Sequence, residues 1–125
     1  MAVLGIDHVQ ISIPPGGEGA ARAFYGGLLG LAEITKPPTL AARGGCWFQA
    51  GPQQLHCGVE PDVAATRRHP GLLVDDLDAV AAALAAHGYA VAPDGGIPGV
   101  RRLHTVDPFG NRLEFVQPID SNPAG

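Results

Sequence analysis

The sequence contains an internal repeat, and four residues that can bind a metal mark it. His8 and His56 lie 48 positions apart in the first half of the chain, and His69 and Glu114 lie 45 positions apart in the second. The two opening histidines are separated by 61 positions and the two closing residues by 58. Because a repeated pattern builds the same substructure twice, the sequence predicts two similar modules.

Each half predicts one strand, one helix and further strands. In the first half, alternation over residues 5–13 precedes helical spacing over 18–29 and short strand-like stretches at 31–34, 39–42, 46–50 and 53–59. In the second half, strands are predicted at 69–74, 89–92, 100–106 and 111–117, and Asp75 or Asp76 can cap a helix that begins near Leu77. We therefore expect an α+β fold of two tandem βαβββ modules.

The predicted modules cover about residues 4–60 and 69–118, with a polar connector at 61–68, within one domain spanning 1–125. Each module has roughly 50 to 60 residues and is too small to bury its own apolar face. The two curved mixed sheets are therefore expected to enclose one metal or ligand cavity.

Composition narrows the classes of function. A net charge of -4 disfavours a nucleic-acid partner, and no apolar run of 18 or more residues exists that could span a membrane. The start of the chain lacks the features of a signal peptide, so a cytoplasmic protein is expected. Cys46 and Cys57 have no metal-binding spacing and are expected to be reduced thiols in or near a core.

Strand parity places three of the four marked residues on polar faces. His8 alternates with aliphatic residues, His56 lies opposite Leu55 and Cys57, and Glu114 lies between Leu113 and Phe115. The position of His69 rests on the repeat offset. Each residue alone has an ordinary explanation. His8 could be a solvated strand residue, His56 a hydrogen-bonded core histidine, His69 a loop histidine, and Glu114 one end of a surface pair with Arg112.

Together the four residues predict a site for a divalent metal formed by His8, His56, His69 and Glu114. Three imidazoles and one carboxylate suit zinc, nickel, cobalt, iron(II) or manganese. His104 could line the same cavity as a proton shuttle, or be a plain sheet residue. Arg101 and Arg102 could hold an anionic group of a substrate. Trp47 and Phe48 could line an apolar pocket or belong to the core.

The segments IDHVQISIP, AFYGGLLGL, LHCGVE, HPGLLVDDLDAV and DPFGNRLEF resemble those of the vicinal oxygen chelate superfamily, which includes glyoxalase I, extradiol dioxygenases and bleomycin-resistance proteins. The resemblance implies two βαβββ modules and one metal ligand from each of four strands, again His8, His56, His69 and Glu114. It also implies a homodimer. Glyoxalase I usually has a glutamate, and methylmalonyl-CoA epimerase a glutamine, at the position of His56, so this chain departs from both there.

The expected function is a metal-dependent enzyme that acts on a small oxygenated metabolite. The ion would stabilise an enolate or vicinal-oxygen intermediate, and Glu114 would be the general base. Isomerase or lyase chemistry is favoured over oxygen insertion. The alternative is a metal-free protein of the same fold that sequesters an antibiotic or a metabolite.

Overall fold

The structure is a computed structural model that describes residues 1–119. Its internal contacts divide the chain into two units, Met1–Ala64 and a second that begins at Ala65. We call them module one and module two and describe each by itself. The predicted single domain with a connector at 61–68 stays a prediction, and its last residues, 120–125, lie outside the described part.

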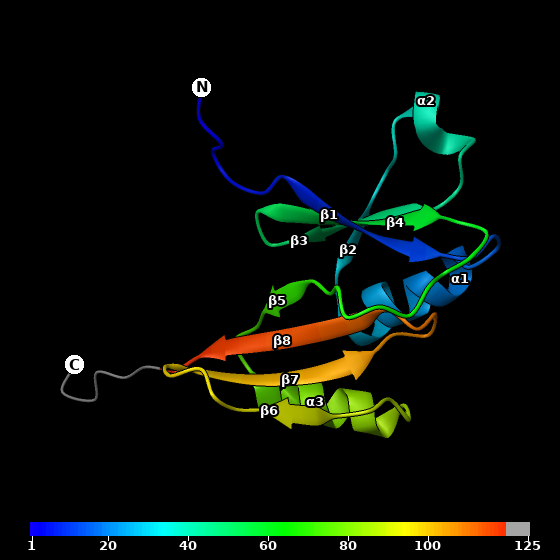
Figure 1. Ribbon diagram of the computed structural model, residues 1–125. Helices are drawn as coiled ribbons and strands as arrows, with labels where there is room; N and C mark the ends of the chain where they lie inside the picture. The colour runs from blue at the N-terminus through cyan, green and yellow to red at the C-terminus, as the bar shows by residue number, and fades with distance from the viewer. Residues whose placement is uncertain (120–125) are drawn as a thin grey trace. The chain divides into compact units, whose positions relative to one another are not determined.

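Module one is a four-stranded mixed sheet with short helices (Figure 1). Its elements are β1 (His8–Ile13), α1 (Glu18–Ala21), the π-helix η1 (Arg22–Leu28), β2 (Ala32–Ile34), α2 (Pro38–Ala41), β3 (Cys46–Ala50) and β4 (Gln53–Val59). The strand order is β1-β4-β3-β2, in which β1 and β4 are parallel and the other pairs are antiparallel.

Module two repeats this topology. Its elements are β5 (Gly71–Leu73), α3 (Leu77–Ala86), β6 (Ala92–Asp94), β7 (Val100–Val106) and β8 (Arg112–Pro118). The strand order is β5-β8-β7-β6, again with one parallel pair, β5 with β8. The predicted α+β fold of two tandem βαβββ modules is therefore confirmed.

The strand register shows that the repeat is structural. His56 lies opposite Gln10, two positions after His8. Glu114 lies opposite Gly71, two positions after His69. Equivalent residues of the two halves therefore occupy equivalent places in the two sheets.

Alternation along the strands separates a core face from a polar face in each sheet. In module two, Leu103, Leu113 and Phe115 are buried, and α3 contacts β7 and β8. In module one, η1 contacts β2 and β3, and its Phe24 and Tyr25 are buried. Because successive side chains point to opposite faces, the polar residues between the buried ones lie together on the other face.

Three local predictions differ from the structure. Residues 39–42 were predicted as a strand, but 39–41 belong to helix α2 and Ala42 is its C-cap. Pro38 occupies the first turn of this helix, a position that its fixed φ favours. Strand β5 is shorter than predicted and leaves His69 just before it. The strand predicted at 89–92 lies later, at Ala92–Asp94, with Pro93 at its centre.

Cys46 and Cys57 lie opposite each other on β3 and β4. Both are buried free thiols, as expected. Among residues 1–119, no helix has the length and apolar character needed to cross a membrane.

Candidate metal centre

Three side chains that can bind a metal meet on the polar face of the module-two sheet. His69, His104 and Glu114 each offer one ligand atom, and these atoms all lie within 4.8 Å of one another. The sheet brings them together because β8 lies between β5 and β7. His104 is directly opposite Glu114 across β7 and β8, and His69 precedes the strand whose Gly71 is opposite Glu114 on the other side.

Glu114 is at the centre of this cluster. Its Oε1 lies 3.0 Å from His104 Nε2 and 3.8 Å from His69 Nε2. The two imidazole rings meet edge to face, with centroids 5.3 Å apart. The side chains of Glu114 and His104 are only 14% and 11% exposed, so water screens their interactions weakly.

The second nitrogen of each ring faces an oxygen atom, and at His69 a hydrogen bond fixes the tautomer. His69 Nδ1 donates to the carbonyl oxygen of Arg67 at 2.9 Å, and His104 Nδ1 lies 3.4 Å from a carboxylate oxygen of Asp94. A neutral imidazole whose Nδ1 donates has a lone pair at Nε2. The Nε2 lone pair of His69 would then face the Glu114 carboxylate, and the two groups repel each other unless a proton or a cation lies between them.

These residues fit a divalent metal. Two Nε2 atoms and a carboxylate, with each second ring nitrogen facing an oxygen atom, are a common donor set for such an ion. Ligands at about 2.0–2.2 Å from a metal are at most roughly 4.4 Å apart, so small movements would bring the three atoms into range.

Arg102 also contacts this centre. Its Nη1 donates to Glu114 Oε1 at 2.7 Å, while its Nη2 donates to the Gly95 carbonyl oxygen at 2.9 Å and lies 3.2 Å from Asp94 Oδ2. The partner of Glu114 is therefore Arg102 on the neighbouring strand, and Arg112 forms no ion pair among the described residues. Arg102 supplies positive charge beside a carboxylate that a metal would also use.

His8 and His56 lie together in module one, on its polar face. Their rings are stacked, with centroids 4.2 Å apart, and the other described neighbour of His56 in this stack is Trp47 at 3.9 Å. His8 Nδ1 lies 2.9 Å from Asp7 Oδ2, and His56 Nε2 lies 2.9 Å from Gln54 Oε1. Burial, and then the neighbouring His8, lower the pKa of His56.

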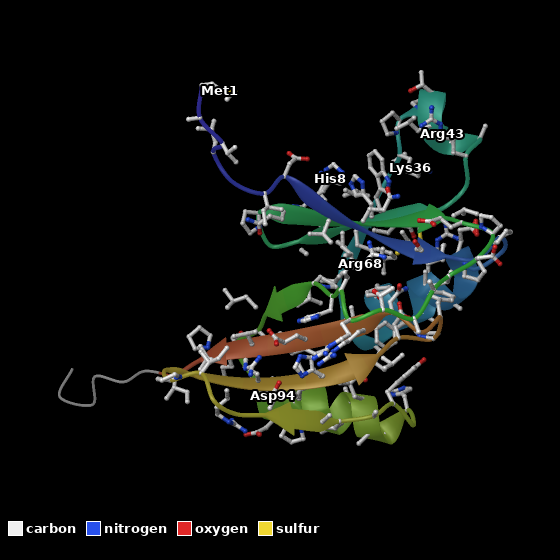
Figure 2. All side chains as sticks on the ribbon, viewed as in Figure 1. Met1, His8, Lys36, Arg43, Arg68 and Asp94 are labelled. Atoms are coloured by element: carbon white, nitrogen blue, oxygen red, sulfur yellow. The ribbon has the colours of Figure 1, made fainter. Side chains whose placement is uncertain are left out.

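The structure thus brings together His69 and Glu114 in one module, and His8 and His56 in the other. Figure 2 labels His8 in module one and Asp94 in module two. Metal binding by all four predicted ligands stays a prediction. Trp47 lies opposite His56 as His104 lies opposite Glu114, so the same place in the repeat holds an aromatic stack in one module and a candidate ligand in the other.

Sequence reasoning did not find the contribution of Asp94 and Arg102. The pairing of His104 with Glu114 had a usable signal, since the strands predicted at 100–106 and 111–117 leave a short turn whose length sets the register of the hairpin. Asp94 had none, because β6 has three residues and Pro93 interrupts any alternation.

Comparison with known families and structures agrees with this fold. The model of the Glyoxalase/Bleomycin resistance protein/Dioxygenase superfamily matches residues 5–115. A crystal structure of a glyoxalase family protein from Bacillus anthracis is 45% identical, with a TM-score of 0.89, and the match covers 94% of this chain and 98% of that one. No curated protein matches.

Two more distant structures share the fold. Lactoylglutathione lyase from Agrobacterium tumefaciens is 20% identical with a TM-score of 0.73, over 93% of this chain and 95% of that one. An antibiotic binding protein from Streptomyces sp. CB03234 is 23% identical with a TM-score of 0.73, over 94% and 98% of the two chains.

Proposed function

This chain belongs to the Glyoxalase/Bleomycin resistance protein/Dioxygenase superfamily, the vicinal oxygen chelate superfamily, and we propose that it is a metal-dependent enzyme. Its substrate would be a small oxygenated metabolite, and its chemistry that of an isomerase or a lyase. The observation that carries the proposal is the convergence of His69 Nε2, His104 Nε2 and Glu114 Oε1, with both Nδ1 atoms facing oxygen acceptors.

In this proposal His69, His104 and Glu114 hold the metal, with His8 and His56 as the further ligands that the sequence pattern predicts. Their nitrogen-rich donor set suits zinc, nickel, cobalt, iron(II) or manganese. A bound ion would act as a Lewis acid that stabilises negative charge on an enolate or on a pair of vicinal oxygens.

Glu114 is proposed as the general base. It is the one carboxylate among the three converging residues, and it could accept a proton from a carbon next to a carbonyl group. Arg102 and His104 both contact Glu114 Oε1 and would keep this carboxylate oriented. His104, at 3.0 Å, is also within reach to pass a proton on.

A metal-free binding protein is the second candidate. The Arg102 guanidinium already offers Glu114 a positive partner at 2.7 Å, which favours a site whose charges are balanced without an ion. A protein of similar fold from Streptomyces is described as an antibiotic binding protein. Under this proposal the protein would sequester a small molecule and not transform it.

Metal analysis separates the two candidates. The enzyme proposal expects bound transition metal in protein purified without added ions, or metal content that rises to saturation on reconstitution. Substoichiometric metal that does not rise would overturn it and support the binding protein.

Substrate screening of metal-loaded protein, with and without oxygen, tests the reaction class. An isomerase or lyase gives equal turnover under both conditions and consumes no oxygen. Turnover that requires oxygen would contradict this assignment and indicate a dioxygenase. The variant Glu114→Gln should lose turnover in either case, because it removes the proposed base.

The proposal includes a homodimer, which the resemblance to the superfamily implies. Light scattering on purified protein should then give twice the mass of the 12.8 kDa chain. A monomeric mass would contradict this part alone.

A further inference from the structure

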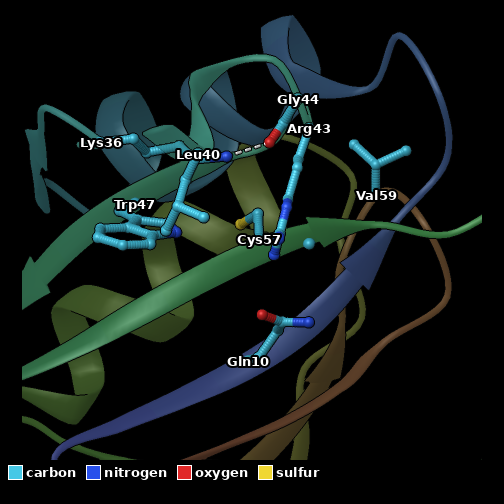
Figure 3. Close-up of a pocket in the computed structure, with 9 residues that line it drawn as sticks. Gln10, Lys36, Leu40, Arg43, Gly44, Trp47, Cys57 and Val59 are labelled. Atoms are coloured by element: carbon cyan, nitrogen blue, oxygen red, sulfur yellow. Dashed lines mark hydrogen bonds between the residues drawn. The ribbon is translucent and has the colours of Figure 1, made fainter. Parts of the chain in front are cut away.

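Module one contains a pocket of about 210 Å³ on the polar face of its sheet. Figure 3 shows its lining: Gln10 from β1, Trp47 from β3, and Lys36 and Arg43 from the segment between β2 and β3, over the end of β4. None of these residues belongs to the cluster around Glu114. This volume is below the roughly 300–1,000 Å³ of sites for drug-sized molecules, which suits a small ligand.

Glycines allow the segment that carries Lys36 and Arg43 to lie close to the sheet. Gly45 has φ +82°, and a Cβ at this position would lie 2.2 Å from the Cys57 carbonyl oxygen. At Gly58 a Cβ would lie 2.5 Å from Gln10 Nε2, so the Gln10 amide rests directly against this glycine. At both positions a neighbouring polar group lies where a side chain would otherwise be. The pocket therefore depends on these two glycines.

The pocket carries unbalanced positive charge. Lys36 and Arg43 are its charged lining residues, and it contains no carboxylate. Among the described residues neither of them forms an ion pair, whereas Arg22, Arg101 and Arg102 all pair with carboxylates. The nearby Glu18 carboxylate lies 3.5 Å from the Gly45 nitrogen and is not part of the lining.

Lys36 and Arg43 differ in whether their charged groups already have a hydrogen-bond partner. The Lys36 ammonium donates to the Gly44 carbonyl oxygen and lies 6.0 Å from the centroid of the Trp47 ring. The Arg43 side chain extends from the loop toward β4 and Gln10 (Figure 3) and has no hydrogen-bond acceptor among the described residues. Its planar fork of N–H donors matches the two oxygens of a carboxylate or a phosphate.

Trp47 supplies a flat apolar wall beside these donors. Its ring is parallel to that of His56, with centroids 3.9 Å apart, so its orientation is fixed by packing. Leu40 adds a second apolar contact in the lining.

We propose that this pocket binds a small organic anion. Its carboxylate or phosphate would lie on Arg43, Lys36 and the Gln10 amide, and its planar part against Trp47 and Leu40. This inference goes beyond the proposed function, because binding here requires no metal.

Trp47 is the one tryptophan of the chain, so its fluorescence reports on this pocket directly. The probes are benzoate, phenyl phosphate and the neutral benzamide, titrated into protein treated with EDTA and then dialysed. We expect both anions to change the fluorescence saturably and to bind at least about tenfold more tightly than benzamide. Their affinities should fall as the salt concentration rises. The tighter of the two identifies the preferred oxyanion. Equal binding of benzamide, or no binding of either anion up to about 10 mM, would overturn the proposal.

The variant Arg43→Gln tests the cation, and Arg68→Gln is the matched control. Both arginines are exposed, so both variants should fold, and both lose one positive charge. We expect Arg43→Gln to weaken benzoate binding at least about tenfold and Arg68→Gln to leave it unchanged. Equal affinity in the two variants would contradict the site. Since the metal has been removed, failure here says nothing against the metal centre, and success does not support it.

Discussion

At the scale of single residues, the partners of the second ring nitrogens determine what the candidate metal centre can bind. Asp94 lies 3.4 Å from His104 Nδ1 and 3.2 Å from Arg102 Nη2. One carboxylate therefore orients both groups that contact Glu114. A carboxylate behind a metal-binding histidine fixes its tautomer and raises its basicity.

Asp94→Asn should weaken zinc binding about 10-fold to 100-fold, because the amide is a poorer partner for His104 Nδ1. Isothermal titration of EDTA-treated, dialysed protein measures this change. Asp78→Asn is the control, since Asp78 also pairs with an arginine, Arg101, outside the cluster. Equal affinities in the two variants would show that Asp94 has no part in the centre.

The stacked His56 makes stability depend on pH. Burial, and then His8, hold its pKa below the ordinary value of about 6.5. As the pH falls through that value, the unfolded chain takes up a proton that the folded chain binds less readily. Stability contributed here is present above about pH 6.5 and is lost as the pH falls toward the lower pKa of the folded state.

Denaturant unfolding of metal-free protein at about pH 8 and pH 5 should therefore show a smaller acid-induced loss of stability in His56→Gln than in the natural protein. His87→Gln replaces an exposed histidine at the end of α3 and should leave the loss unchanged. An identical pH dependence in all three proteins would contradict the role of His56.

At the scale of elements, helix α3 begins where the sequence indicated. Asp76 accepts a hydrogen bond from the Ala79 nitrogen at 3.0 Å, which satisfies one of the free N–H groups of the first turn. The sequence allowed Asp75 or Asp76 as the cap, and the backbone geometry chooses Asp76. Replacing Asp76 with Ala should lower the free energy of unfolding by about 1 kcal/mol, as measured in urea. Asp75→Ala should have little effect, and equal losses would contradict the assignment of the cap.

The turn before β3 depends on Gly45. A side chain at Gly45 would combine a left-handed φ with a collision against the Cys57 carbonyl oxygen. Gly45→Ala should therefore cost about 3 kcal/mol or more. Gly96→Ala has a similar positive φ with open space around the new Cβ, and should cost only about 1 kcal/mol. Urea unfolding of both variants compares the two costs, and equal values would mean that the collision is relieved.

At the scale of the whole molecule, the repeat explains why so much of the fold could be predicted. Strands β3, β4 and β7 were predicted at their observed bounds, because their alternation is long and turns flank them. Helix α2 was mistaken for a strand because four residues are too few to show a period. Strand β6 was misplaced because pairing with β7, and not its own sequence, makes it a strand.

The candidate site was predictable in part for the same reason. The repeat offset identified His69 and Glu114, which the structure brings within 3.8 Å. The contacts of Asp94 and Arg102 depend on tertiary pairing between strands, for which a single sequence has no local signal. The equivalence of Trp47 and His104 also required the register of both hairpins.

Zinc titration of EDTA-treated, dialysed protein, comparing the natural chain with His69→Ala, tests the central claim most directly. The account predicts saturable binding by the natural protein and binding at least about tenfold weaker in His69→Ala, with His87→Ala unchanged. A natural protein that does not bind zinc saturably, or binds it equally well without the imidazole of His69, would contradict the metal centre.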